Sequence, residues 1–204
     1  MQTKRRTSAG YRSMAARALA VALVAFSAMA GALVLQLPAA QAQLVPENDM
    51  VVAIRTGEVS AVEEAFLAGL SANERSLKGE TALIEAVRTG SRALVELFID
   101  RGARINVAAR RSRLTALEES VRINRPDLTR ILITAGADVD KAGTDGETPV
   151  LIAAKLGHAN VVEALIEADA YLNDTDNTGR TPLTLARERR HTAVVRMLEA
   201  AGAE

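Results

Sequence analysis

The chain has 204 residues and no Cys or Trp, and 49% of its residues are hydrophobic. The absence of Cys excludes disulfide bonds, thiolate metal ligands, thiol catalysis and lipid attachment to a Cys. The formal net charge is zero, but residues 1–42 hold five Lys and Arg and no Asp or Glu. The remainder carries 20 cations against 25 anions, a net charge of −5, which excludes a general nucleic-acid binder.

Residues 1–42 have the parts of a secretory signal peptide. The basic start is followed by 20 uncharged residues, ALAVALVAFSAMAGALVLQL, at 18–37. Pro38 and the Ala-x-Ala pattern of Ala40 and Ala42 predict cleavage after Ala42, with a linker over 43–47. The alternative is an uncleaved anchor, because 20 apolar residues can span a bilayer. We expect cleavage, since Ala and Gly weaken the span, and a periplasmic or secreted protein.

The rest of the chain repeats itself with a period near 33. Thr81, Thr115, Thr148 and Thr181 are spaced 34, 33 and 33, and open the segments TALIEAVRTG, TALEESVRIN, TPVLIAAKLG and TPLTLARERR. A weaker copy, NDMVVAIRTG, starts 33 residues before Thr81. Later landmarks keep the same spacing: Gly69, Gly102, Gly136, Asp169 and Gly202, followed by Asn73, Asn106, Asp140 and Asn173. A fixed period of this length indicates a stacked repeat.

Each unit is predicted to be a pair of short helices. Thr148 is placed to cap the first helix, and Thr115 with Glu118 fits a capping box. Gly157 is expected to end the first helix in the left-handed conformation. Val161, Val162, Leu165 and Ile166 share one face of the second helix. Neither helix is long enough to be stable alone, so neighbouring units must bury each other's apolar faces.

The period, the Thr-Pro-Leu-like starts, the Gly-His-x-x-Val-Val middles and the Gly-Ala-x-x-Asn ends resemble the ankyrin repeat. The resemblance covers 48–204 and implies an all-α solenoid of about five helix-turn-helix repeats with β-turn fingers, at approximately 48–76, 77–110, 111–143, 144–176 and 177–204. The third repeat departs most, with one extra residue within 107–114 and Asn124 in place of Gly. The family's His after Thr-Pro-Leu is absent from every copy.

The sequence contains no motif for catalysis, a cofactor or a metal. The two His, His158 and His191, fall in a slot where the resemblance implies a hydrogen bond to backbone between repeats. The Asp174–Gly179 segment has a faint likeness to a calcium loop but lacks the bidentate Glu, so no calcium site is predicted. The acidic pairs, which include Glu118 and Glu119, are expected to be solvated.

A column of cations follows the first helix of successive repeats: Arg55, Arg88, Arg122 and Lys155, with Glu188 in the last copy. By resemblance this column and the fingers line the concave binding face of the stack. An alternative reading is that a cation simply suits a helix end, because it interacts favourably with the helix dipole. The protein-binding residues that we predict are Arg88, Arg110, Arg111, Arg113, Leu114, Arg122, Ile123, Lys155 and Leu156.

The function predicted from these observations is a non-enzymatic protein-interaction module without a cofactor. Its partner should be a protein with an acidic, partly apolar surface, bound by a monomer of this chain. Two alternatives stay open: an accessory or inhibitor that docks on a secreted enzyme, and a membrane-anchored scaffold if the N-terminal segment is retained.

Overall fold

The computed structural model describes residues 49–143 and 146–204, so the predicted signal peptide and linker lie outside the described residues. The described residues form ten α-helices and no β-strand beyond one isolated bridge, between Arg75 and Thr81. The helices are α2 (Asp49–Thr56), α3 (Val59–Leu67), α4 (Ala82–Thr89), α5 (Arg92–Asp100), α6 (Ala116–Arg122), α7 (Pro126–Thr134), α8 (Pro149–Leu156), α9 (Ala159–Ile166), α10 (Pro182–Glu188) and α11 (Thr192–Ala200).

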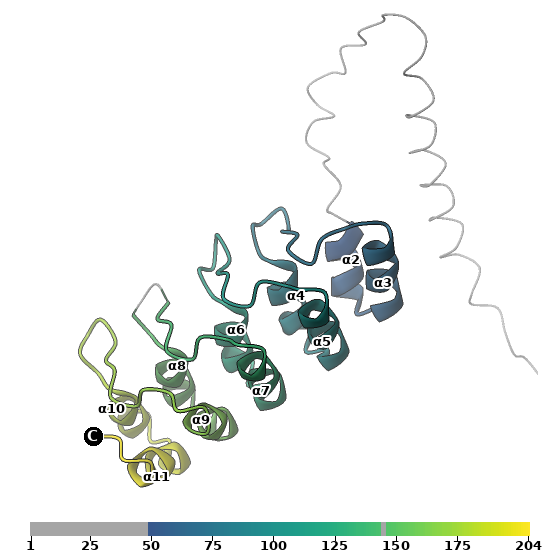
Figure 1. Cartoon of the computed structure of the whole chain (residues 1–204). Helices are drawn as coiled ribbons and strands as arrows, with labels where there is room; N and C mark the ends of the chain where they lie inside the picture. Colours follow the sequence, from purple (N-terminus) through teal and green to yellow (C-terminus); the bar gives the residue numbers. More distant parts are fainter. Residues whose placement is uncertain (1–48, 144–145) are drawn as a thin grey trace, which may run out of the picture. The chain divides into compact units, whose positions relative to one another are not determined.

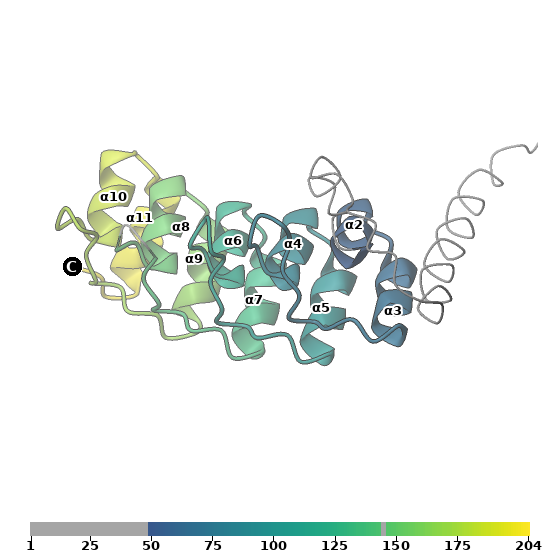
Figure 2. The ribbon, with the colours of Figure 1, turned by 90° about the horizontal axis from the view of Figure 1, so that it is seen from above.

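The helices form two parallel rows (Figures 1 and 2). The inner row is α2, α4, α6, α8 and α10, and each inner helix packs against the next. The outer row is α3, α5, α7, α9 and α11, and each predicted repeat contributes one helix to each row. Loops that we call fingers project between an outer helix and the next inner helix. Each finger takes the number of its repeat, so that the second finger precedes α4 and the third precedes α6. The all-α repeat fold predicted from the sequence is confirmed, while the exact domain limits stay predictions.

Threonines occupy the N-cap positions of four inner helices, α4, α6, α8 and α10, as predicted. The hydroxyls of Thr81 and Thr181 accept hydrogen bonds from backbone N–H groups three residues later. Thr115 and Glu118 form the predicted capping box, in which Glu118 Oε2 accepts from the Thr115 N–H at 2.7 Å. The prediction for Thr148 is wrong in part: it occupies the N-cap position, but its buried hydroxyl has no hydrogen-bond partner within 49–143 or 146–204. Nothing in the structure explains that exception.

The turn after each inner helix needs a left-handed residue. Gly57, Gly90 and Gly157 have φ between 70° and 76°, where Gly carries no steric cost. Asn124 takes the same conformation in the third repeat with φ 55°, and Asn tolerates this region better than most residues. The predicted helix end at Gly157 is therefore confirmed.

The core lies between the rows and between adjacent repeats. Val161, Val162 and Leu165 of α9 are fully buried, and Ile166 packs against them at the margin, as predicted. All ten helices have only seven to nine residues. Helices this short gain their stability from packing against neighbours. None of the helices in the described part of the chain is long and apolar enough to cross a bilayer.

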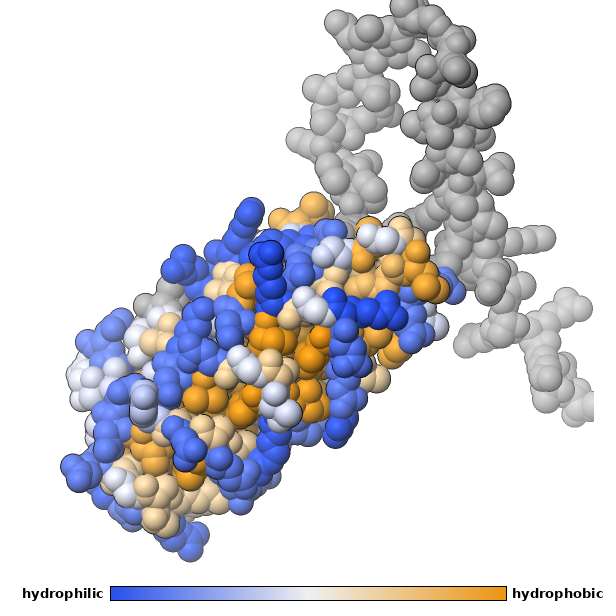
Figure 3. Space-filling view, in the orientation of Figure 1, coloured by the Kyte–Doolittle hydropathy of each residue, from blue (hydrophilic) through white to orange (hydrophobic). Residues whose placement is uncertain are grey.

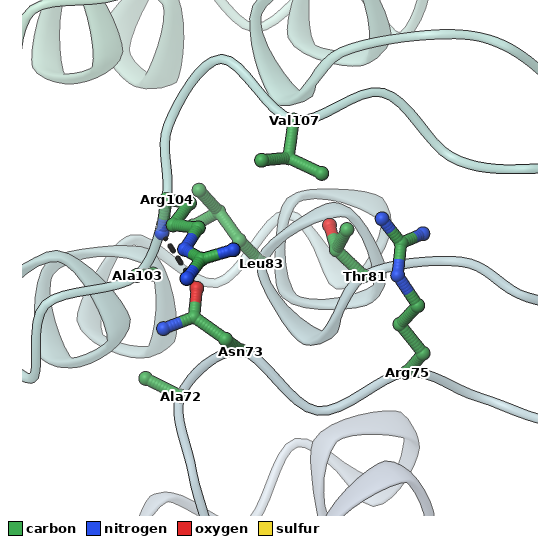
Figure 4. Close-up of a pocket in the computed structure, with 8 residues that line it drawn as sticks. All are labelled: Ala72, Asn73, Arg75, Thr81, Leu83, Ala103, Arg104 and Val107. Atoms are coloured by element: carbon green, nitrogen blue, oxygen red, sulfur yellow. Dashed lines mark hydrogen bonds between the residues drawn. The ribbon is translucent and has the colours of Figure 1, made fainter.

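A ladder of amide and carboxylate side chains ties each repeat to the next at the base of the fingers. The Arg104 N–H donates to Asn73 Oδ1 at 2.9 Å, as Figure 4 shows. The same bond recurs at the following junctions, where Asn106, Asp140 and Asn173 accept from Asp138, Tyr171 and Glu204. The small hollow of about 60 Å³ beside Asn73 therefore belongs to a structural junction.

Candidate functional site

The column of cations identified in the sequence lies at the ends of the inner helices, and two of its members form ion pairs with an acid of the next repeat. Arg55 of α2 pairs with Glu85 of α4 at 3.0 Å, and Arg88 of α4 pairs with Glu119 of α6 at 3.0 Å. Arg88 also lies 3.3 Å from Glu80 in the second finger. Burial works against the charge of Arg88, but the hydrogen bond and attraction from Glu119 outweigh it and raise its pKa.

These ion pairs correct one expectation. Glu118 and Glu119 were expected to be solvated, but they lie on the inner helix α6 with 1% and 8% of their surface exposed. Glu118 is held by the capping box, and Glu119 by Arg88 of the preceding repeat. Glu85 is also nearly buried, with 5% of its surface exposed, and Arg55 of the preceding repeat holds it. A buried carboxylate requires such partners, because its desolvation is costly.

The ion pairs follow a rule that the repeat makes visible. The acid stands four residues after the Thr that opens a repeat, and it pairs with the cation that ends the inner helix of the repeat before. In the fourth and fifth repeats that acid position holds Ile152 and Leu185. Lys155 pairs with Glu147 of its own repeat at 2.6 Å, as Arg88 does with Glu80 at 3.3 Å. Arg122 is exposed, and no hydrogen bond or ion pair joins its side chain to another residue within 49–143 or 146–204.

The third finger is wider than its neighbours and is fixed in place. The Arg113 N–H donates to the Ala109 carbonyl, whereas the fingers before and after close one residue sooner. This accommodates the extra residue predicted in the third repeat. The Arg110 N–H donates to the Gly79 carbonyl, and the Ser112 hydroxyl donates to Glu80 Oε2 at 3.2 Å. The finger is thereby tied to the one before it.

Arginines crowd the tip of this finger. Arg110, Arg111 and Arg113 are all exposed, and their side chains contact no acid among the residues that the structure describes. Arg113 has φ 61°, in the left-handed region that costs a side-chain-bearing residue free energy. The corresponding residues of the other fingers are Gly79, Gly146 and Gly179, with φ of 70° to 80°. The third finger therefore has an arginine in the left-handed conformation, whereas the other fingers have a glycine there.

A hollow of about 200 Å³ connects the third finger to the end of α6, and we call it the third-junction hollow. Its lining residues are Ser112, Leu114, Glu118, Arg122, Gly143, Glu147 and Ile152. One oxygen of Glu118, Oε1, is buried there without a hydrogen-bond partner among the residues that the structure describes. A Cβ at Gly143 would lie 2.6 Å from that oxygen, so the backbone at Gly143 covers it. The charges of Arg122 and Lys155 balance those of Glu118 and Glu147 around this hollow. The arginines of the third finger add positive charge beside it.

The other predicted binding residues are less uniform. Ile123 is half-buried and packs against the core, and Leu114 is half-buried in the third-junction hollow. Leu156 is 42% exposed at the end of α8. Figure 3 shows one face of the stack, where apolar residues form a broken band between hydrophilic margins. The structure thus brings Leu114 and Arg122 together in one hollow, whereas it pairs Arg88 and Lys155 with acids.

The two histidines and Asp176 have structural partners. His158 Nδ1 lies 2.8 Å from the Val121 carbonyl and His191 Nε2 lies 3.2 Å from the Lys155 carbonyl, each in the repeat before, as predicted. Asp176 accepts bonds from Thr178 and Arg180 in its own finger, and those bonds, from the Thr178 hydroxyl first, hold its pKa well below the usual range. The described residues contain no cluster of His, Cys, Asp or Glu that could hold a metal.

Comparison with known families agrees with this architecture. A family model described as "Ankyrin repeats (3 copies)" matches residues 50–143 and, in a second overlapping match, residues 117–204. The two matches together span well over half of the chain. No curated protein matches the chain at a significant level.

Proposed function

Because the chain belongs to the ankyrin-repeat family, whose members are typically non-enzymatic protein-interaction modules, we propose that it is an exported binding protein without enzymatic activity. Its partner is a protein with an acidic, partly apolar surface. The observation that carries this proposal is the set of cations on the third finger and at the end of α6 that no acid of the described stack neutralises: Arg110, Arg111, Arg113 and Arg122.

The physical support comes from preorganisation. Arg122 ends a helix held on both sides by α4 and α8, and the third finger is bonded to the second. Side chains presented by a rigid frame lose little entropy on binding. Arginine favours bidentate recognition of carboxylates, and the exposed positive charge makes the interaction sensitive to salt. Leu114, which is half-buried beside Arg122, supplies apolar contact area.

Reversing the charge of Arg111 and Arg122 together tests this function. The Arg111→Glu, Arg122→Glu double variant should weaken binding to the natural partner by at least about tenfold, because like charges then meet. The melting temperature should change little, because both side chains are exposed and substitutions of exposed residues usually have small effects on stability. Titration calorimetry and thermal unfolding measure the two effects.

The matched control is the Arg189→Glu, Arg196→Glu double variant. It changes the net charge by the same amount, at two exposed positions of the last repeat. The control should bind normally. Equal loss of affinity in both variants would show a diffuse charge effect, and full affinity of the first would place the binding surface elsewhere.

Export is the second part of the proposal, and the basic start, apolar stretch and Ala-x-Ala pattern of residues 1–42 support it. Mature protein should begin at Gln43 and be soluble without detergent. Mass spectrometry of the protein from its own cells gives the N-terminus. Intact residues 1–42 on membrane-bound protein would instead favour the anchored scaffold.

A further inference from the structure

The cation that ends each inner helix has a different partner at different junctions between repeats. At the first two junctions the cation at the end of an inner helix receives a carboxylate from the next repeat: Glu85 for Arg55 and Glu119 for Arg88. Both acids are nearly buried and both N–O distances are 3.0 Å. These two ion pairs show how a carboxylate binds a cation of this column.

At the third junction the acid position carries no carboxylate. Ile152 occupies the acid position and is 4% exposed within the core. Arg122 keeps the cation position and lines the third-junction hollow together with Ile152. Glu147 also lines this hollow, but Lys155 holds it at 2.6 Å. Glu118 is committed to Thr115 through one oxygen, while Gly143 covers the other.

We propose that a carboxylate of the partner completes the third junction, taking beside Arg122 the role that Glu85 and Glu119 play for Arg55 and Arg88. This inference rests on the proposed function and names the group that the inner face recognises. The group is a single Asp or Glu side chain next to an apolar residue, and that apolar residue contacts Leu114. A run of acids fits less well, because Glu118 already places negative charge in the hollow.

The decisive experiment supplies the missing acid from within the chain. Ile152→Glu should rebuild the pair with Arg122 and so occupy the place that the partner needs. Ile152→Gln is the matched control, with the same length and polarity but no charge. The probes are peptides selected from a random displayed library on the purified protein and measured by calorimetry. Selected peptides should share one Asp or Glu beside an apolar residue.

For such a peptide, Ile152→Glu should reduce affinity at least about tenfold more than Ile152→Gln does. The slot accepts a glutamate at the two preceding junctions, which favours a folded variant. A second measurement does not depend on that variant. Changing the peptide's acid to its amide should weaken binding to the wild-type protein but not to Arg122→Gln, so the double-mutant cycle shows coupling.

Equal affinities of the Ile152→Glu and Ile152→Gln variants would overturn the inference if both are folded, and so would the absence of coupling in the cycle. These failures differ from failure of the proposed function. If the Arg111→Glu, Arg122→Glu variant loses the natural partner while the cycle shows no coupling, the inner face binds an acidic partner without a carboxylate at Arg122. If that variant keeps the partner, the proposed function itself fails.

Discussion

Replacing Leu165 with Ala should lower the free energy of unfolding by about 2–5 kcal/mol, the range for large-to-small changes in a packed core. Leu165 is fully buried in α9, in a cluster with Val161, Val162 and Leu198. Helix α9 packs against α7 on one side and α11 on the other. The cavity therefore opens at the contact between repeats, where an eight-residue helix gains most of its stability.

Urea unfolding followed by circular dichroism measures this change. Asn160→Ala is the matched control, because Asn160 is exposed on the same helix and its replacement should stay within about 0.5 kcal/mol. A loss for Leu165→Ala no larger than that of the control would contradict the packing of α9 between its neighbours.

Local signals explain why so much of the fold could be predicted from the sequence. Each of these signals acts within one repeat. They are a Thr three residues before a backbone donor, a Gly in the left-handed conformation, and four apolar residues on one helix face. The structure places Thr81, Gly157 and Leu165 as these signals require. Repetition then multiplies each signal, because an accidental pattern does not recur every 33 residues.

The buried ion pairs could not be found in the same way, since they join residues about one period apart. Glu119 beside Glu118 resembles an ordinary solvated pair until Arg88 of the preceding repeat is considered with it. The spacing of 30 or 31 residues between partners was nevertheless present in the sequence. The same column comparison distinguishes Arg122 from Arg88, because the position equivalent to Glu119 holds Ile152 in the following repeat.

The conformation of the third finger also lies beyond a single-repeat pattern. The extra residue within 107–114 was visible, but it did not indicate which residue would become left-handed. The wider turn places Arg113 where the other fingers have Gly. A side chain kept in such a conformation costs stability, so its retention calls for a gain elsewhere.

Arg113→Gly should therefore change two measured quantities in opposite directions. Stability should rise by about 1 kcal/mol, because Gly adopts the left-handed region without the steric cost that Arg has there. Affinity for the acidic partner should fall by roughly 10–100-fold, the loss expected for a hydrogen bond to a charged group. Urea unfolding and calorimetry on the same preparation measure the two effects.

Arg190→Gly is the matched control for this prediction. Arg190 also has φ 61°, but it lies in the turn between α10 and α11 of the last repeat. Removing its side chain should raise stability by a similar amount and leave binding unchanged. If both variants gain stability and neither loses affinity, Arg113 does not contact the partner and its strain has no function in binding. If Arg113→Gly lowers stability instead, the arginine side chain stabilises the turn, and the prediction that it is strained there is wrong.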